Sequence, residues 1–252
     1  MPTAWVVGAS SGIGRDVALC LAAEGFRVSA SARTMSALRA LAESFGALQR
    51  IGPVPVDVTD SASVATALAE VERSAPVDLC IIAAGTHMPM TLPQFTADAV
   101  EQLVDLNLLG VVRVLTAVLP GMLARRKGHI VVIASVAGYR GLPTAAAYGA
   151  SKAALIHLCE SLHLDLRGTG VRIQLVNPGF VRTPLTDRNT FPMPFRMESA
   201  DAARRIVAAL RSRRFEVTFP RRFTWILKVL RVLPYAMYFP LVGRLRKPGT
   251  AE

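Results

Sequence analysis

The sequence contains few cysteines, no long uncharged apolar run and no low-complexity region. Cys20, Cys80 and Cys159 lie far apart in apolar segments, which argues against a disulfide framework and favours a reducing compartment. No run of about eighteen uncharged apolar residues is available to cross a bilayer, and the first residues lack the pattern of a signal peptide. We therefore expect a cytoplasmic protein.

Metal-ligating clusters and linkers are also missing from the sequence. The histidines are scattered along the chain, at His87, His129, His157 and His163. We therefore expect no metal site. Because no Pro/Gly/Ser-rich linker divides the 252 residues, of which 52% are hydrophobic, we expect one domain over residues 1–220 with an extension over residues 221–252.

Acidic residues become scarce towards the end of the sequence. Residues 211–252 contain ten Lys and Arg against two Glu, whereas residues 1–210 contain nineteen Lys and Arg against sixteen Asp and Glu. The net charge of +11 therefore belongs mostly to the last residues. Because the larger part is nearly balanced and shows no recognisable nucleic-acid-binding module, we do not expect binding to nucleic acid.

Short apolar segments alternate with helix-like segments along the chain. The strand-like segments are residues 4–10, 26–32, 52–58, 77–85, 128–138, 171–179 and 215–220. The helix-like segments are residues 15–25, 35–46, 61–74, 98–126, 146–170 and 200–212. Strands that are apolar on both faces and alternate with helices indicate a parallel sheet covered on each side. We predict an α/β fold of the doubly wound Rossmann type, with three layers and a mostly parallel, seven-stranded sheet.

A glycine-rich turn, in the sequence VVGASSGIGR, joins the first strand-like segment to the first helix-like segment. Glycine permits a tight turn and lets a pyrophosphate approach the backbone, and the helix N-terminus supplies free N–H groups. The spacing G-x-x-x-G-x-G differs from the commonest fingerprint, but its place between a strand and a helix indicates a dinucleotide site. The residues expected to bind the dinucleotide here are Gly8, Ser10, Ser11, Gly12, Ile13 and Gly14.

The end of the second strand-like segment indicates which dinucleotide binds. An acidic side chain at this point accepts a hydrogen bond from the 2′-hydroxyl of NAD, but here the sequence has Arg33. A guanidinium can bind a 2′-phosphate, so we predict NADP(H) as the cofactor, with Arg15 as a second candidate cation. The alternative is that Arg33 is a solvated residue before the next helix.

Several motifs in a fixed order make the chain resemble the short-chain dehydrogenase/reductases, over roughly residues 4–220. They are GASSGIG at 8–14, DVTD at 57–60, AAG at 83–85, the asparagine of LNLLG at 106–110, Ser135 followed by YGASK at 148–152, and NPGFVRT at 177–183. The sequence departs from the family pattern at Val7, where threonine is frequent, and at Ile82 and Ala83, where the family often has two asparagines. These departures remove side-chain hydrogen bonds that support loops, and leave the residues of the chemistry in place.

The resemblance implies a catalytic group formed by Asn107, Ser135, Tyr148 and Lys152. Tyr148 would donate a proton to a carbonyl oxygen that Ser135 orients, and Asn107 would hold a water on the proton path. Lys152, one helical turn after Tyr148, would hold the nicotinamide ribose and lower the tyrosine pKa from its usual ~10. Taken one at a time, Ser135 could end a strand, Asn107 could bend or cap a helix, and Tyr148 and Lys152 could be a surface pair.

The same resemblance implies further contacts to the cofactor. Asp57 and Val58 would lie beside the adenine, and Ala84 and Gly85 beside its ribose and the pyrophosphate. The residues expected near the nicotinamide are Pro178, Gly179, Val181 and Thr183.

The segment over residues 184–199 is expected to cover the substrate, although it could also be a passive surface loop. Its apolar residues Phe191, Met193, Phe195 and Met197 are flanked by polar ones, Asp187, Arg188 and Asn189. Further wall residues are expected at His87, Met88, Met90 and Tyr139. Nothing here is an obvious anchor for a charged substrate group, although Arg140 or Arg188 could serve as one.

The extension contains basic residues interleaved with apolar and aromatic ones. Its longest uncharged run, residues 232–243, is too short to span a bilayer. Residues 221–247 could lie at an anionic membrane surface, or could fold over the substrate mouth or a partner subunit.

The sequence therefore predicts an NADP(H)-dependent oxidoreductase that interconverts a ketone or aldehyde with its alcohol, acting on an apolar carbonyl compound. The alternative is a catalytically silent NADP-binding protein with a regulatory or membrane-surface role. By analogy with the family we expect a homodimer or homotetramer.

Overall fold

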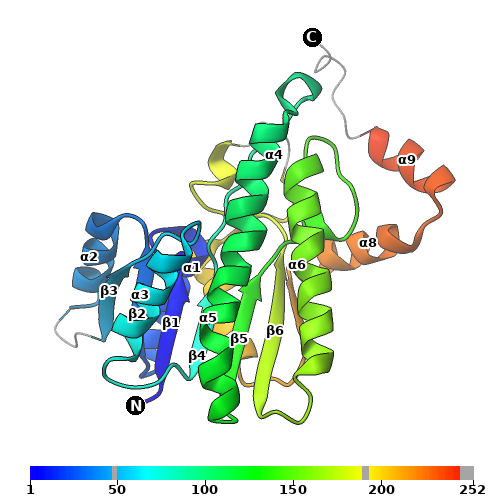
Figure 1. The fold of residues 1–252 in the computed structure, drawn as a ribbon. Helices are drawn as coiled ribbons and strands as arrows, with labels where there is room; N and C mark the ends of the chain where they lie inside the picture. The colour runs from blue at the N-terminus through cyan, green and yellow to red at the C-terminus, as the bar shows by residue number, and fades with distance from the viewer. Residues whose placement is uncertain (47–49, 189–192, 245–252) are drawn as a thin grey trace.

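The computed structural model describes residues 1–46, 50–188 and 193–244. It confirms the predicted doubly wound α/β fold with its parallel, seven-stranded sheet (Figure 1). In spatial order the strands are β3 (Ile51–Pro55), β2 (Arg27–Ala32), β1 (Thr3–Val7), β4 (Leu79–Ile82), β5 (Gly128–Ile133), β6 (Val171–Pro178) and β9 (Glu216–Phe219).

Helices cover both faces of this sheet. In Figure 1, α5 and α6 cross the near face. That layer consists of α3 (Ser61–Glu72), α5 (Gly110–Ala124) and α6 (Ala146–Asp165). The other layer consists of α1 (Gly12–Ala23), α2 (Met35–Ser44) and α7 (Ser199–Ala209).

Strand β1 shows why the central strands are mostly apolar on both faces. Trp5 and Val7 pack into the core cluster with α3, α5 and α6, whereas Ala4 and Val6 pack into the cluster with α1, α2 and α7. Successive side chains of a strand point to opposite faces, so a sheet covered on both sides favours apolar residues on both faces of its strands. The buried indole N–H of Trp5 donates to Ser31 Oγ on β2 at 2.8 Å.

The helix expected over residues 98–126 is interrupted in the structure. It consists of α4 (Ala97–Val104), a π-helical segment η3 (Asp105–Leu109) and α5. A π-helix has a wider turn than an α-helix and often lies at a functional site; here it contains the buried Asn107. Within the described residues, Ala97–Ala124 is the one helical stretch long and apolar enough to cross a membrane, but it lies beside α3 and α6 on the sheet.

Two short strands lie in and beside the segment expected to cover the substrate. β7 (Val181–Arg182) pairs with β8 (Met197–Glu198), and a short 3₁₀ turn, η5 (Thr186–Arg188), lies between them. 3₁₀ turns of the same length follow β4 and β5, at η2 (Leu92–Gln94) and η4 (Val136–Gly138). After β9 the chain forms α8 (Arg221–Val232) and α9 (Tyr235–Gly243), which extend beyond the sheet (Figure 1).

Three backbone segments meet at the carboxyl end of β1. Gly8 has φ +93°, and a Cβ atom on it would lie 2.5 Å from the backbone nitrogen of Ala84. A Cβ atom on Gly14 would lie 2.2 Å from the carbonyl oxygen of Gly8. Because β1 lies between β2 and β4, this contact stands where the strand order reverses, which is the usual ligand position in such sheets.

We predict that Gly14→Ala lowers the free energy of unfolding by about 1–3 kcal/mol, because the added methyl group overlaps backbone atoms that cannot move aside. Urea denaturation followed by circular dichroism measures this change. Gly52→Ala is the matched control, because nothing lies within 4 Å of its added methyl group. Equal stability of the two variants would contradict the role of this contact.

Candidate functional site

An open cavity of about 390 Å³ lies at the carboxyl ends of the strands. All but one of the residues that the sequence assigns to catalysis or cofactor binding line it. They are Gly8, Ser10, Ser11, Gly12, Ile13, Gly14, Arg33, Asp57, Val58, Ala84, Gly85, Ser135, Tyr148, Lys152, Pro178, Gly179, Val181 and Thr183. The exception, Asn107, is fully buried behind the wall.

The glycine-rich turn places the start of α1 at the floor of the cavity. Ser11 is the residue before the helix, its side chain makes no capping hydrogen bond, and the first turn contains no acidic residue. The first backbone N–H groups of α1 are therefore available to an anion, and the helix dipole favours negative charge there. On the opposite side, Thr183 lies so close that a Cβ atom on Gly12 would be 2.9 Å from its methyl group.

Arg33 is an exposed cation at the end of β2 and lines the cavity. Asp57 lies across from it, and two hydrogen bonds from Thr59 to Asp57 Oδ1, at 2.7 and 2.9 Å, lower the carboxyl pKa, with a smaller effect of the Arg33 charge. The Asp57 carboxylate therefore accepts hydrogen bonds within its own turn and does not pair with Arg33. The Arg33 guanidinium remains available to a phosphate.

Arg15, the second candidate cation, is turned away from the cavity. Its guanidinium pairs with Asp16 at 2.8 Å, and Asp16 also accepts a hydrogen bond from Ser199. Arg15 is also not among the residues that line the cavity. The structure therefore gives no support to Arg15 as a phosphate ligand.

Tyr148 and Ser135 approach each other because the η4 turn lies against the first turns of α6. A Cβ atom on Gly138 would be 2.6 Å from the backbone of Lys152, so glycine permits this close packing. Burial raises the pKa of the Tyr148 phenol, and its hydrogen bond with Ser135 lowers it in part. The hydroxyl therefore keeps its proton at neutral pH.

Lys152 lies one turn further along α6 and is buried. Its ammonium donates to the carbonyl oxygen of Ile133 at 3.2 Å and lies 5.7 Å from the centre of the Tyr148 ring. Burial lowers the pKa of Lys152 to about 8. Burial outweighs the lowering of the Tyr148 pKa that the sequence predicts from Lys152, so the net shift of this pKa is upward.

Asn107 connects three elements behind the cavity. Its Oδ1 accepts a hydrogen bond from the backbone N–H of Thr86 at 2.7 Å, and its Nδ2 donates to the carbonyl of Thr86 at 2.9 Å and to Ser151 Oγ at 3.3 Å. The side chain thus holds the loop after β4 against α6. This contact is a positioning one, and a water on the proton path stays a prediction.

The residues of the segment expected to cover the substrate make contacts with different parts of the protein. Met197 lies on β8 and packs against the core cluster of α1 and α7. The prediction that its side chain covers the substrate is therefore wrong. Asp187 pairs with Arg196, which closes the segment on itself. Phe195 is half exposed and faces the ring of Phe223. Asn189 and Phe191 lie outside the described residues.

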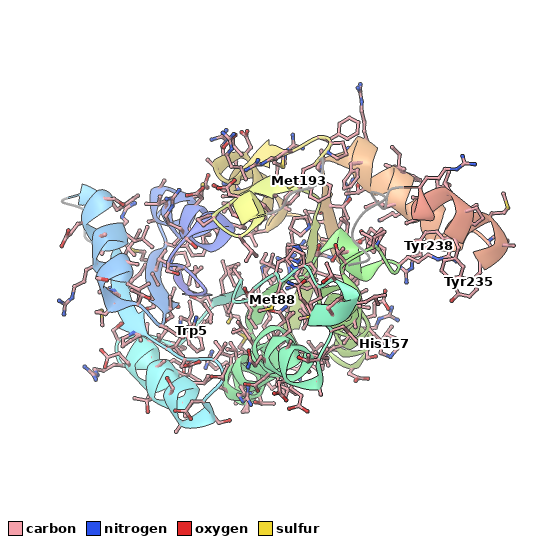
Figure 2. All side chains as sticks on the ribbon, turned by 90° about the horizontal axis from the view of Figure 1, so that it is seen from above. Trp5, Met88, His157, Met193, Tyr235 and Tyr238 are labelled. Carbon is pink, nitrogen blue, oxygen red and sulfur yellow. The ribbon has the colours of Figure 1, made fainter. Side chains whose placement is uncertain are left out.

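The other expected wall residues are spread over different environments. The His87 ring meets the Tyr148 ring edge-on at 4.5 Å between centroids. Met90 is buried against Leu103, whereas Met88 is exposed. Figure 2 looks onto this end of the molecule, with Met88 and Met193 labelled on two different segments. The Tyr139 hydroxyl donates to Glu216 on the last strand, β9, and Tyr139 does not line the cavity.

Helix α8 lies beside the site, which agrees with the alternative that the extension folds over the substrate mouth; the sequence interpretation did not single out Phe223. The ring of Phe223 lies on Gly179, where a Cβ atom would be 2.8 Å from it, and tilts against Phe180 at 5.3 Å between centroids. Glu216 of β9 accepts hydrogen bonds from Tyr139, Asn177 and Lys228, and these outweigh the effect of burial and lower its pKa. The sequence signal was an aromatic residue, Phe223, four residues after the end of the last strand.

We predict that the affinity for NADPH falls as the pH rises through about 8, because Lys152 then loses the charge with which it would hold the cofactor. Loss of a charge-assisted hydrogen bond costs about 1.5 kcal/mol, so the dissociation constant should rise by up to about tenfold. Fluorescence titration with NADPH at successive pH values measures it. Lys152→Met should remove this dependence, and parallel profiles of both proteins would contradict the assignment.

Comparison with known proteins places this geometry in a family. The model of the short chain dehydrogenase family matches residues 2–192. An uncharacterized oxidoreductase of Myxococcus xanthus is 40% identical over 246 residues, which cover 97% of each chain.

Solved structures agree with this assignment. A short chain dehydrogenase from Burkholderia cenocepacia in complex with NADP is 27% identical and has a TM-score of 0.83, covering 98% of each chain. A short chain dehydrogenase/reductase from Burkholderia phymatum in complex with NAD is 26% identical and has a TM-score of 0.82, covering 90% of this chain and 92% of the other. This chain belongs to the short-chain dehydrogenase/reductases, a family of oxidoreductases that use NAD(P)(H).

Proposed function

We propose that the protein is an NADP(H)-dependent oxidoreductase that interconverts an apolar ketone or aldehyde with its alcohol. The observation that carries this proposal is the Tyr148 phenol beside Ser135 in the same cavity as the glycine-rich turn, where burial raises the phenol pKa. This arrangement joins a proton donor to a dinucleotide site, as reduction of a carbonyl requires.

The residues present fit a nicotinamide dinucleotide. Gly8 and Gly14 leave backbone atoms where side chains would block a pyrophosphate, and the start of α1 offers N–H groups to it. Arg33 supports the phosphorylated form, because a guanidinium binds a 2′-phosphate with charge-assisted hydrogen bonds. When bound, NADPH supplies the hydride for the carbonyl carbon.

The side chains around Tyr148 act on the carbonyl oxygen. Ser135 would hold this oxygen by a hydrogen bond, and Tyr148 would transfer its proton as negative charge develops on the oxygen. Lys152 is protonated below about pH 8 and would stabilise the phenolate that remains. Asn107 keeps the loop after β4 and α6 in register during this transfer.

The described residues around the mouth favour an apolar substrate. Phe180, Phe195 and Phe223 form a group of rings beside Gly179. The nearby charges are used within the protein: Asp187 pairs with Arg196, and the Arg140 guanidinium donates to carbonyl groups at the end of α8. These contacts leave apolar surface to meet the substrate.

The family is commonly oligomeric. The outer side of α4, α5 and α6 supports a homodimer or homotetramer for this chain, because the stretch Ala97–Ala124 is long, apolar and only partly buried.

We predict that Tyr148→Phe lowers kcat for reduction of an aromatic ketone by about 10²–10⁴-fold, the usual contribution of a general acid. The NADPH dissociation constant should change less than about twofold, since the ring is kept. NADPH oxidation and fluorescence titration measure the two quantities. Tyr235→Phe, at an exposed position, is the control and should retain activity. Activity that survives in Tyr148→Phe would overturn the mechanism. Absence of activity in Tyr148→Phe and in the control Tyr235→Phe, with intact NADPH binding, would favour the catalytically silent alternative.

We predict that Arg33→Asp lowers kcat/KM for NADPH by about 10–100-fold relative to NADH, because the charge-assisted bonds to the 2′-phosphate are replaced by repulsion. Steady-state kinetics with both cofactors measure the ratio. Arg39→Asp makes the same charge change at an exposed position of α2 and should leave the ratio as it is. An unchanged ratio in Arg33→Asp would rule out this assignment of cofactor preference.

A further inference from the structure

Helices α8 and α9 expose a continuous set of large apolar side chains. Among the described residues, eight of the sixteen exposed large apolar side chains belong to these two helices. On α8 they recur at every third or fourth residue, which places them on one helix face. We call the following residues the outer face: Trp225, Ile226, Val229, Val232, Tyr235, Met237, Phe239 and Leu241.

The inner side of the two helices is held by the body of the protein. Phe223 packs on Gly179, and the buried Thr224 donates to Thr218 Oγ1 at 3.1 Å. The Tyr238 hydroxyl donates to the carbonyl of Gly141 at 2.6 Å, and the ring lies 3.9 Å from the Arg140 guanidinium. These contacts fix which side of each helix points inward, so the outer face is presented to the surroundings. Figure 1 shows both helices beyond the edge of the sheet, and Figure 2 shows Tyr235 and Tyr238 at the same outlying end.

Isolated exposed apolar residues are ordinary, but a contiguous patch of this kind marks an interaction surface. Neither helix can span a bilayer, because α8 has 12 residues and α9 has 9. If the partner is a membrane, the outer face must therefore lie on its surface, because the two helices cannot pass through it.

The charge around the outer face identifies the partner. Between residues 217 and 251 the sequence has no Asp or Glu but seven Lys and Arg. The exposed cations Arg221 and Arg222 begin α8, Arg231 lies near its end, and Arg244 follows α9. Two copies that met through this face would bring like charges together. An anionic phospholipid surface instead complements them, while Trp225 and Tyr235 are side chains that favour the lipid–water interface.

We propose that the outer face of α8 and α9 binds the surface of an anionic phospholipid membrane and holds the mouth of the cavity beside it. The link to the mouth is short, because Phe223 belongs to α8 and packs on Gly179, which lines the cavity. The carbonyl substrate then enters from the membrane; this second part rests on the proposed function, whereas the docking does not.

The test measures sedimentation of the full chain with vesicles of phosphatidylcholine alone or mixed with phosphatidylglycerol. Point variants are preferable to removal of the helices, since Thr224 and Phe223 are part of the folded body. Ile226 and Val229 are 52% and 55% exposed, so Ile226→Ser with Val229→Ser should lower the affinity on the order of tenfold. The matched control is Leu123→Ser with Leu164→Ser, at positions 40% and 56% exposed on α5 and α6. It should bind the vesicles as the wild type does, and size-exclusion chromatography checks that both double variants keep the wild-type oligomeric state.

A second pair of variants tests the charge. Arg222→Glu should lower the affinity for the mixed vesicles on the order of tenfold, whereas Arg167→Glu, the same change at an exposed turn residue just after α6, should not. Binding by the wild-type protein should also fall as NaCl is raised, which requires no variant. Absence of wild-type binding, or equal binding by the two apolar double variants, would overturn the proposal. A change of oligomeric state in Ile226→Ser/Val229→Ser without any vesicle binding would assign the face to a second copy.

Activity separates this proposal from the proposed function. With a water-soluble ketone, the outer-face variants should keep the wild-type kcat/KM, and with a long-chain ketone dissolved in anionic vesicles their rate should fall on the order of tenfold. Vesicle binding without ketone reduction would refute the proposed function alone. Reduction of both ketones without vesicle binding would refute the docking alone.

Discussion

The site depends on a contact between backbone atoms in which side chains have no room. Gly8, Gly14 and the backbone at Ala84 approach so closely that a single Cβ atom would overlap peptide groups. This contact sets the distance between the start of α1 and the loop after β4, and so the width of the dinucleotide site. Because the strand order reverses at β1, the open space beside the contact is bounded by two halves of one sheet and not by a movable domain.

A chain of hydrogen bonds extends from that contact to the proton donor. The loop after β4 continues to Thr86, whose backbone is bound on both its N–H and its carbonyl by Asn107, and Asn107 reaches Ser151 on α6. Tyr148 and Lys152 stand on the same helix. The π-helical turn between α4 and α5 contains Asn107 at its buried side. The side chain of Asn107 thus holds the cofactor side and the proton-donor side together, because an amide offers both an acceptor oxygen and N–H donors.

Burial of the Lys152 ammonium costs free energy, because the charge loses its contact with water. A lysine deprived of water has a lowered pKa, so part of the stability of the fold is given up to keep a cation beside Tyr148. The same loss of water keeps the phenol protonated, as a proton donor requires. For Glu216 the hydrogen bonds outweigh the effect of burial, so three donors lower its pKa and keep the carboxylate charged. Its contact with Lys228 also connects α8 to the last strand.

The sequence by itself determined the layers of the fold and the residues that gather at the carboxyl ends of the strands, since strands that are mostly apolar on both faces and the placed motifs depend on local pattern alone. What only the tertiary structure decided depends on contacts between distant segments. The direction of the Tyr148 pKa follows from packing of the η4 turn on α6, and the loss of Arg15 as a ligand follows from Asp16 beside it. The role of α8 follows from Phe223 meeting Gly179, 44 residues earlier in the sequence. Burial and long-range pairing have no signature in local spacing, because they arise only when the sheet brings these segments together.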